Sequence, residues 1–287
     1  MNNLTDKKLK NWDSQWGSLF KSRVNNRDEY PAGPAAGPGI LAKYHQYYDQ
    51  ATQGIKEPSV LVLGSTPELR DYALSQGAKL SILDQNEEVM KNMTSIMKYK
   101  DSKNEKKVIG NWLEMPFENN NFDLVWGDGI TNNVLFKEHS KLFTEIVRIL
   151  KSNGHLLLRD DFIDPKEDKL SIMDSIEWAH KNKMHKYDLF FKLYAYSTDG
   201  HIDHEKHLID MAIIADKMEK DIYGKGILTE DEEKMLKEFM TGTVKSTFVT
   251  RDMWLENFKQ YFDLIEVGIV DDYYFCKYFN FLFASPR

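Results

Sequence analysis

A glycine and an aspartate, twenty residues apart, carry the clearest chemical signal in this sequence. Gly64 ends the apolar run SVLVLG, and Asp84 ends the run KLSILD. If both runs are neighbouring parallel strands, the turn and the carboxylate meet at the sheet edge where ligands bind. The glycine lets a ligand approach the backbone closely, and the carboxylate can accept hydrogen bonds from both hydroxyls of a ribose. The pattern therefore predicts a site for a cofactor that contains ribose.

The turn itself argues against a cofactor with a pyrophosphate. It reads GSTP, whereas dinucleotide sites use G-x-G-x-x-G so that the pyrophosphate rests on bare backbone. Thr66 and Leu69 occupy the later glycine positions, and Glu68 places a negative charge in the first helical turn. A cofactor with ribose but no phosphate avoids this repulsion, and S-adenosylmethionine is such a cofactor.

Strands and helices are expected to alternate around this turn. Continuous apolar runs predict strands at residues 59–64, 79–84, 106–112, 122–129 and 155–160. Amphipathic runs predict helices at residues 40–54, 67–77, 86–100 and 133–154. Because right-handed crossovers join successive parallel strands, this alternation predicts an α/β fold with a doubly wound sheet.

The pattern changes after residue 164. Residues 165–245 have helical periodicity, and no strand is expected there, whereas strand patterns return at 261–270 and 272–284. We therefore expect three parts, namely N-terminal helices with a Pro/Gly linker (1–55), a cofactor-binding core (56–164 and 246–287) and a helical cap insertion (165–245).

Four segments, in order, resemble the class I S-adenosylmethionine-dependent methyltransferases. They read VLVLGSTPELRD, SILDQNEEVM, GNWLEMPFENNNFDLVWGDG and RILKSNGHLLLRD, and the resemblance covers residues 59–161. More narrowly, the chain resembles a bacterial branch whose first motif reads VLGSTPELR. The resemblance implies a Rossmann-like, seven-stranded sheet with its last strand antiparallel. It also implies S-adenosylmethionine as cofactor and S-adenosylhomocysteine as product.

The resemblance also implies a set of cofactor-binding residues, which are Gly64, Ser65, Thr66, Pro67, Asp84, Gln85, Asn111, Trp112, Asp128 and Gly129. Asp84 would bind the ribose hydroxyls, and Trp112 would pack on the adenine. Asn111 replaces an aspartate that often accepts the adenine amino group, and its amide oxygen can still accept. Val62 replaces a common acid, so Asp128 is the alternative partner for the cofactor ammonium, although it could equally cap the following loop.

Candidates for catalysis and acceptor binding lie outside these motifs. Asp160, after the fifth strand, could orient an acceptor, as could Asp161, and both could equally cap the next helix. In HIDHEKH, a helix would place His201, His204 and His207 along one face, where a solvated surface is favoured over a general base. We expect His201 and Tyr194 to contact the acceptor, and Asp160 and His201 are the catalytic candidates.

Composition narrows the possible partners. The net charge of −7 argues against nucleic-acid binding, which leaves a small molecule or a peptide as acceptor. The single cysteine, Cys276, excludes an internal disulfide and a Cys-based zinc cluster, and no metal site is expected. The first residues lack the apolar core of a signal peptide, and no apolar run approaches the ~18 residues that span a bilayer. We expect a cytoplasmic protein without membrane contact.

These observations predict a methyltransferase that acts on oxygen or nitrogen of its acceptor. Methyl transfer from a sulfonium depends on alignment and desolvation more than on acid catalysis, so a general base is not required. Two other classes stay open. One is an inactive S-adenosylmethionine-binding partner or sensor protein, and the other is a nicotinamide (NAD)-dependent oxidoreductase, which the phosphate argument disfavours.

Overall fold

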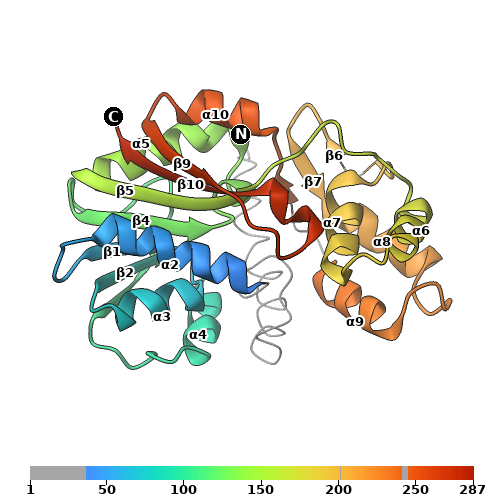
Figure 1. Ribbon diagram of the computed structural model, residues 1–287, viewed down its shortest axis with the longest axis horizontal. Helices are drawn as coiled ribbons and strands as arrows, with labels where there is room; N and C mark the ends of the chain where they lie inside the picture. The colour runs from blue at the N-terminus through green and yellow to red at the C-terminus, as the bar shows by residue number, and fades with distance from the viewer. Residues whose placement is uncertain (1–36, 201, 241–244) are drawn as a thin grey trace.

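A single mixed sheet forms the core of the protein. The computed structural model describes residues 37–200, 202–240 and 245–287, and the calls on residues 1–36 lie outside these ranges. The sheet has seven strands in the order β3-β2-β1-β4-β5-β10-β9 (Figure 1). They are β1 (Ser59–Leu63), β2 (Lys79–Asp84), β3 (Glu105–Ile109), β4 (Phe122–Asp128), β5 (Leu150–Asp161), β9 (Phe262–Gly268) and β10 (Phe279–Pro286). β1 to β5 are parallel, and β10 is antiparallel to both β5 and β9, so the expected topology is confirmed.

Helices cover both faces of the sheet. One face carries α2 (Pro38–Thr52), α3 (Pro67–Ser75) and α4 (Glu87–Ser95), and the other carries α5 (His139–Ile149) and α10 (Arg251–Phe258) (Figure 1). Pro67 begins α3 in the position where its missing N–H costs nothing. Asn86 caps α4 by accepting a hydrogen bond from the Val89 backbone at 2.9 Å. Large aromatic side chains fill the layers, with Trp126 on the α2 face and Trp254 on the other.

The long helix expected at residues 133–154 was wrong at both ends. Two short 3₁₀ turns, η3 (Thr131–Asn133) and η4 (Phe136–Glu138), precede α5, and β5 already begins at Leu150. Leu135 is extended, which breaks any continuous helix, and the ring of His139 lies 3.0 Å from the Thr131 carbonyl oxygen. At the other end, Leu150 pairs with Phe122 of β4 and is almost fully buried. Pairing with the sheet therefore overrides the helical periodicity.

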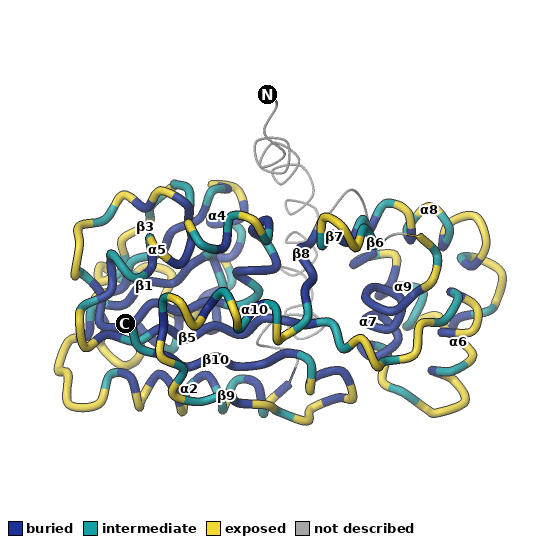
Figure 2. Tube along the Cα trace, turned by 90° about the horizontal axis from the view of Figure 1, so that it is seen from above, coloured by how far each residue is buried: buried dark blue, intermediate teal, exposed yellow. Residues whose placement is uncertain are grey.

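Residues 165–245, which we call the helical region, lie beside the strand ends (Figure 1). They contain α6 (Ile172–Lys181), α7 (Lys186–Tyr196), α8 (Met211–Asp221) and α9 (Glu230–Phe239). They also contain β6 (Ile202–Asp203) and β7 (Leu208–Asp210), which join β8 (Lys245–Thr247) in a small sheet, so the expectation of no strand was wrong. Figure 2 shows α7 buried at the centre of this region. The expected domain boundaries remain a prediction.

A buried lysine on α7 joins the helical region to the core. Lys192 Nζ donates to Glu167 Oε1 at 3.0 Å and lies 5.0 Å from the centre of the Trp178 ring. Glu167 Oε2 also accepts from the hydroxyls of Tyr274 and Tyr278, at 3.2 and 2.7 Å. Both tyrosines belong to η5 (Tyr274–Tyr278), which runs directly into β10. The helical region is therefore tied to a strand of the main sheet.

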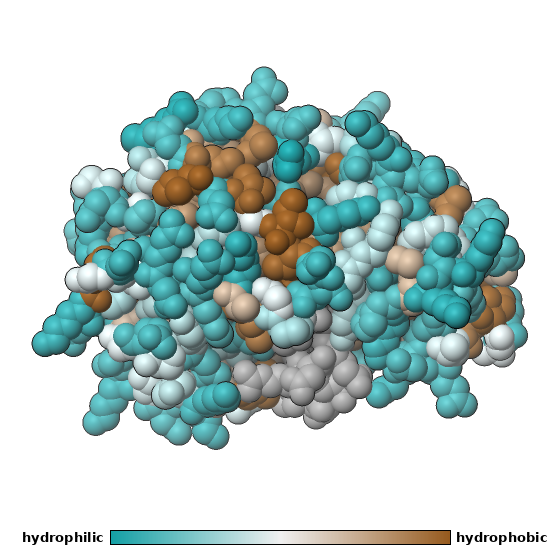
Figure 3. Space-filling model, in the orientation of Figure 1, coloured by the Kyte–Doolittle hydropathy of each residue, from teal (hydrophilic) through white to brown (hydrophobic). Residues whose placement is uncertain are grey.

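The surface is largely hydrophilic. Figure 3 shows hydrophobic side chains on one face only as small, separate patches. Ile265 and Ile269 are about half exposed near the edge strand β9. Within the described ranges, no helix has the length and apolar character needed to cross a membrane.

Candidate active site

The turn after β1 has the geometry that only glycine adopts easily. Gly64 has φ +82°, and its N–H donates to the Leu83 carbonyl oxygen at 2.9 Å. A Cβ atom at this position would lie 3.8 Å from the Trp112 ring, so space alone would allow a side chain. The left-handed backbone is therefore the reason for glycine. Trp112 Nε1 donates to the same Leu83 oxygen at 2.8 Å, which packs the indole beside the turn.

Ser65 and Asp84 join the turn to the end of β2. Ser65 Oγ donates to Asp84 Oδ2 at 2.5 Å, and the Asn86 backbone donates to Oδ1 at 3.0 Å. Both side chains are buried. Burial raises the pKa of Asp84, although the hydrogen bonds from Ser65 and from the backbone oppose this rise. A buried carboxylate is thus fixed beside the glycine turn, at the position where the sequence analysis predicts a ribose.

An arginine that the sequence analysis missed also contacts this turn. Arg70 is fully buried, and its Nη1 donates to the Ser65 carbonyl oxygen at 3.3 Å. Its Nε and Nη2 donate to the two carboxylate oxygens of Glu105, at 2.7 and 2.9 Å, and Nη2 also donates to Thr94 Oγ1. The only signal was a charged residue inside the motif GSTPELR, because Glu105 lies on another strand, 35 residues away.

The other cofactor candidates lie around this turn. Thr66 precedes α3 and is half-buried, as is Gln85 at the end of β2. Asn111 Oδ1 accepts from the Leu113 backbone at 2.9 Å, so part of its accepting capacity stabilises a local turn. Glu68 lies in the first turn of α3 and is buried, in the position that would oppose a phosphate. The roles of these residues in cofactor binding remain predictions.

Asp128 lies at the same sheet edge but already has partners. Leu63 of β1 pairs with Gly127 of β4, so the two strands end side by side. Asp128 Oδ1 accepts from Arg159 Nε and from the Tyr44 hydroxyl, both at 2.7 Å. The Arg159 guanidinium therefore offsets the negative charge of Asp128, which the sequence analysis expected to pair with the cofactor ammonium. Neither Arg159 nor Tyr44 was identified from sequence, because β5 and α2 bring them in from distant segments.

Gly129 continues this strand end with φ +65°, and its N–H donates to the Arg159 carbonyl oxygen at 2.8 Å. Asn133 Nδ2 donates to the Gly129 oxygen at 2.7 Å, which closes the loop after β4. Gly129 therefore stabilises the loop, and the loop-capping alternative for Asp128 remains a prediction. Their contact with the cofactor remains a prediction.

Asp160 is fully buried at the end of β5. Its Oδ1 accepts from the Thr131 backbone at 2.9 Å, while Oδ2 has no hydrogen-bond partner among the described residues. Burial raises the pKa of Asp160 to about 7, despite the hydrogen bond from Thr131. The side chain supports the loop after β4, and its catalytic role remains a prediction.

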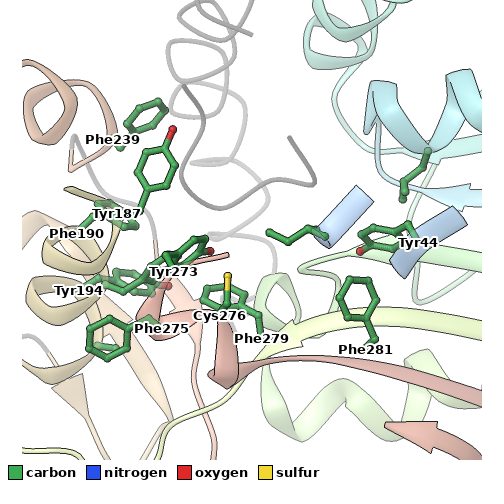
Figure 4. Close-up of a cluster of buried hydrophobic side chains, with 14 of the residues drawn as sticks. Tyr44, Tyr187, Phe190, Tyr194, Phe239, Tyr273, Phe275, Cys276, Phe279 and Phe281 are labelled. Carbon is green, nitrogen blue, oxygen red and sulfur yellow. The ribbon is translucent and has the colours of Figure 1, made fainter. Parts of the chain in front are cut away.

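Tyr194 belongs to a set of aromatic rings where the helical region meets the core (Figure 4). Its ring stacks on Phe190 with centres 5.7 Å apart and meets Phe248 edge-on at 5.4 Å. The set continues through Phe191 to Phe279 on β10, with centres 4.6 Å apart. Tyr194 is buried, so packing accounts for much of its surface, and an acceptor contact remains a prediction.

The histidine motif does not form the expected helix. His204 and His207 lie in and beside the turn between β6 and β7, and His207 has φ +53°. His201 lies outside the described residues. His207 packs edge-on against Phe136 at 5.2 Å, and His204 is exposed. Within the described ranges, no group of three or more His, Cys, Asp or Glu side chains is arranged to hold a metal ion.

A comparison with protein families identifies part of this core. Residues 64–158 match a family model described as a methyltransferase domain. The match includes the Gly64 turn, Asp84 and Asp128, and it agrees with the resemblance seen in the sequence. The narrower branch motif remains a prediction. A search of curated proteins finds no significant match.

Solved structures share the fold over most of their length. A putative Zn-dependent alcohol dehydrogenase from Rhodobacter sphaeroides has a TM-score of 0.54 at 12% identity, covering 84% of this chain and 90% of its own. N-methyltransferase NodS from Bradyrhizobium japonicum WM9, in complex with S-adenosylhomocysteine, has 0.51 at 9%, covering 93% and 95%. Glycopeptide N-methyltransferase MtfA, also in complex with S-adenosylhomocysteine, has 0.50 at 11%, covering 85% and 90%. At these identities the likeness shows the fold.

Proposed function

Because residues 64–158 carry a methyltransferase domain within a class I-type sheet, we propose that this protein is an S-adenosylmethionine-dependent methyltransferase. Its acceptor is a small molecule or a peptide, methylated at oxygen or nitrogen. The observation that carries the proposal is the unit formed by the Gly64 turn and the Ser65–Asp84 hydrogen bond.

The described residues fit this cofactor. Asp84 accepts hydrogen bonds from Ser65 and from the Asn86 backbone, and an ionised carboxylate has about four accepting positions. The Gln85 backbone is a third donor, so about one position is left for a ribose hydroxyl. Glu68 in the first turn of α3 disfavours a pyrophosphate, which weighs against a dinucleotide. S-adenosylmethionine has the ribose and lacks the phosphates.

The residues of the site contribute mainly position and exclusion of water. When bound, the cofactor supplies an electrophilic methyl group on a sulfonium. The Gly64 turn and Asp84 fix the ribose, and the Trp112 indole borders the turn. The helical region covers the acceptor side, with Tyr194 and His201 as expected acceptor contacts and Asp160 as an expected orienting group. Alignment and desolvation of this kind can supply much of the rate enhancement of a transfer reaction.

Thermal unfolding with two ligands tests the proposal. We expect S-adenosylhomocysteine, at about 100 times its Kd, to raise Tm by about 5 °C, because binding to the folded state adds ~2.7 kcal/mol. NAD should leave Tm unchanged. An NAD shift without an S-adenosylhomocysteine shift would favour the oxidoreductase class. Binding without methyl transfer to any acceptor in a labelled-methyl survey would favour the inactive partner or sensor.

Two leucine substitutions place the ligand. Ser65→Leu puts a large side chain into the buried turn and should abolish the S-adenosylhomocysteine shift. Ser75→Leu, at the exposed C-terminal end of α3, should keep the S-adenosylhomocysteine shift. If both variants bind equally well, the cofactor site lies elsewhere.

A further inference from the structure

A second carboxyl group at the end of β5 receives no hydrogen bond from another residue among the described residues, and its own backbone N–H is the hydrogen-bond donor that favours its charged form. Asp161 is 9% exposed, and no hydrogen bond from another side chain reaches its carboxyl among the described residues. A buried carboxylate without a donor is costly, so such a group is uncommon unless a ligand completes it. Burial and, to a smaller extent, the neighbouring charge of Asp160 together raise the pKa of Asp161 to about 8.

The backbone of Asp161 is held firmly, although its side chain is not. Asn132, on the loop after β4, accepts from the Asp161 N–H at 3.2 Å and donates to the Asp161 carbonyl oxygen at 3.1 Å. Its amide also donates to the Thr247 carbonyl oxygen at 3.0 Å. These hydrogen bonds fix the backbone position from which the Asp161 side chain extends. A side chain on a fixed backbone, with no donor in the described part of the chain other than its own N–H, is well placed to receive a ligand.

Strand register places this carboxyl on the acceptor side of the site. Asp161 pairs with Phe279 and Arg159 pairs with Phe281, so these side chains share one face of the sheet, whereas Asp160 is on the other. Asp161 lies two residues beyond Arg159, toward the helical region. β5 is two strands away from β1, so its end lies about 10 Å across the sheet from the Gly64 turn.

The surroundings of Asp161 lack positive charge. Its field includes the carboxyls of Asp128 and Asp160, and Arg159 is the only cation among the main contributors. Arg159 is already paired with Asp128 at 2.7 Å. A neutral hydroxyl ligand would donate a hydrogen bond to Asp161 but would not offset the negative charge of the neighbouring carboxyl groups. An ammonium group would do both.

We propose that the Asp161 carboxyl binds the methyl acceptor and that this acceptor is an amine. Because an ammonium nitrogen has no lone pair, the Asp161 carboxylate would take one of its protons. The freed lone pair would then bond to the methyl carbon as the bond from that carbon to sulfur breaks, which leaves S-adenosylhomocysteine. The inference rests on the proposed methyltransferase function and narrows it from oxygen or nitrogen to nitrogen. Asp161 and Asp160 cannot share a metal ion in place of the amine, because successive strand residues face opposite sides of the sheet.

Calorimetry with matched amines and alcohols tests this inference. Wild-type protein saturated with S-adenosylhomocysteine is titrated with 2-phenylethylamine and n-butylamine, and then with 2-phenylethanol and n-butanol. We expect at least one amine to bind at least tenfold more tightly than its alcohol, as a charged hydrogen bond would give. Failure of both amines to bind, or equal binding of amine and alcohol, overturns the inference.

Asp161→Asn assigns the selectivity to this residue. The variant should lose the preference for the amine, while its affinity for S-adenosylhomocysteine stays within twofold of the wild type. Asp216→Asn, in an exposed ion pair with Lys220, should keep the preference. If Asp161→Asn instead weakens S-adenosylmethionine relative to S-adenosylhomocysteine and keeps the amine preference, the missing cation is the sulfonium and the inference fails. If the wild type does not bind S-adenosylhomocysteine at all, the proposed function itself fails.

Discussion

At the residue scale, Asp84 combines a structural task with a proposed binding task. It accepts hydrogen bonds from Ser65 and from the Asn86 backbone, and these donors favour its ionised form against the effect of burial. The same carboxylate is the proposed ribose ligand. Because β2 is held in the sheet by its pairing with β1 and β3, loss of this side chain should affect binding more than folding.

Asp84→Ala should therefore weaken binding of S-adenosylhomocysteine by about 1.5–3 kcal/mol, the usual loss for a hydrogen bond to a charged group. Calorimetry on the folded variant measures this change. Asp263→Ala, which removes an exposed carboxylate on β9 that pairs with Arg287, should leave the affinity unchanged. Equal affinity of Asp84→Ala and the wild type would remove the ribose assignment.

Residues close in the motif were predictable, and residues supplied by distant segments were not. The sequence identified Gly64 and Asp84 because a turn and a strand end are local patterns. It missed Arg159 and Tyr44, which reach Asp128 from β5 and α2. It also predicted that the Asp128 carboxylate would be available to the cofactor, whereas in the structure this carboxylate pairs with the Arg159 guanidinium. Such pairings depend on tertiary contacts that no local spacing encodes.

At the element scale, the position of α3 depends on one buried ion pair. Arg70 on α3 and Glu105 on β3 are both at most 1% exposed, and Arg70 also holds the Ser65 carbonyl oxygen. Removing one member of a buried pair leaves the other charge uncompensated, which is more costly than losing an exposed pair. The helix that begins at the cofactor turn should therefore be sensitive to Glu105.

Glu105→Gln should lower the free energy of unfolding by about 3–5 kcal/mol, as measured by urea denaturation. The same substitution at Glu87, in an exposed pair with Lys91, is the matched control and should leave the urea midpoint almost unchanged. Similar midpoints for both variants would show that the buried pair does not stabilise α3.

Elements with a strong local pattern were predicted well. β2 matches its expected range at both ends because its apolar run is bounded by a lysine and an aspartate. The segment 133–154 failed, since Leu150 continues a helical pattern but pairs with Phe122 in the sheet. The strands β6 and β7 have only two and three residues, too short for any period to emerge.

At the scale of the whole molecule, the excess of buried acid links function to stability. The pKa of Asp160 is about 7 and that of Asp161 about 8, mainly because of burial. An unfolded aspartate has a pKa of about 3.9, so the folded protein binds more protons between about pH 4 and pH 8. The free energy of unfolding should therefore fall as the pH rises through this window.

Asp161→Asn removes one of these two groups and should flatten the pH dependence. Between pH 5 and pH 8.5 the wild type should lose stability relative to the variant, on the order of 4 kcal/mol, because the folded and unfolded states differ in the protonation of Asp161 over about three pH units. The charged groups that act on Asp161 are Asp160, Arg159 and Asp128, and they are unchanged in this variant. Parallel curves for the two proteins would contradict the assignment.

The place of β10 inside the sheet has a consequence for the order of synthesis. β5 ends at Asp161, but its neighbour β10 begins at Phe279, so the ribosome makes the whole helical region before β5 gains that partner. Until then, β5 presents an open edge, and Asp161 remains hydrated and ionised. An open strand edge is a site of aggregation, and contacts so distant in sequence form slowly. The charge on the unprotected strand end should thus act in the nascent chain as a gatekeeper against association, before the folded protein uses the same carboxyl in its proposed contact with the acceptor.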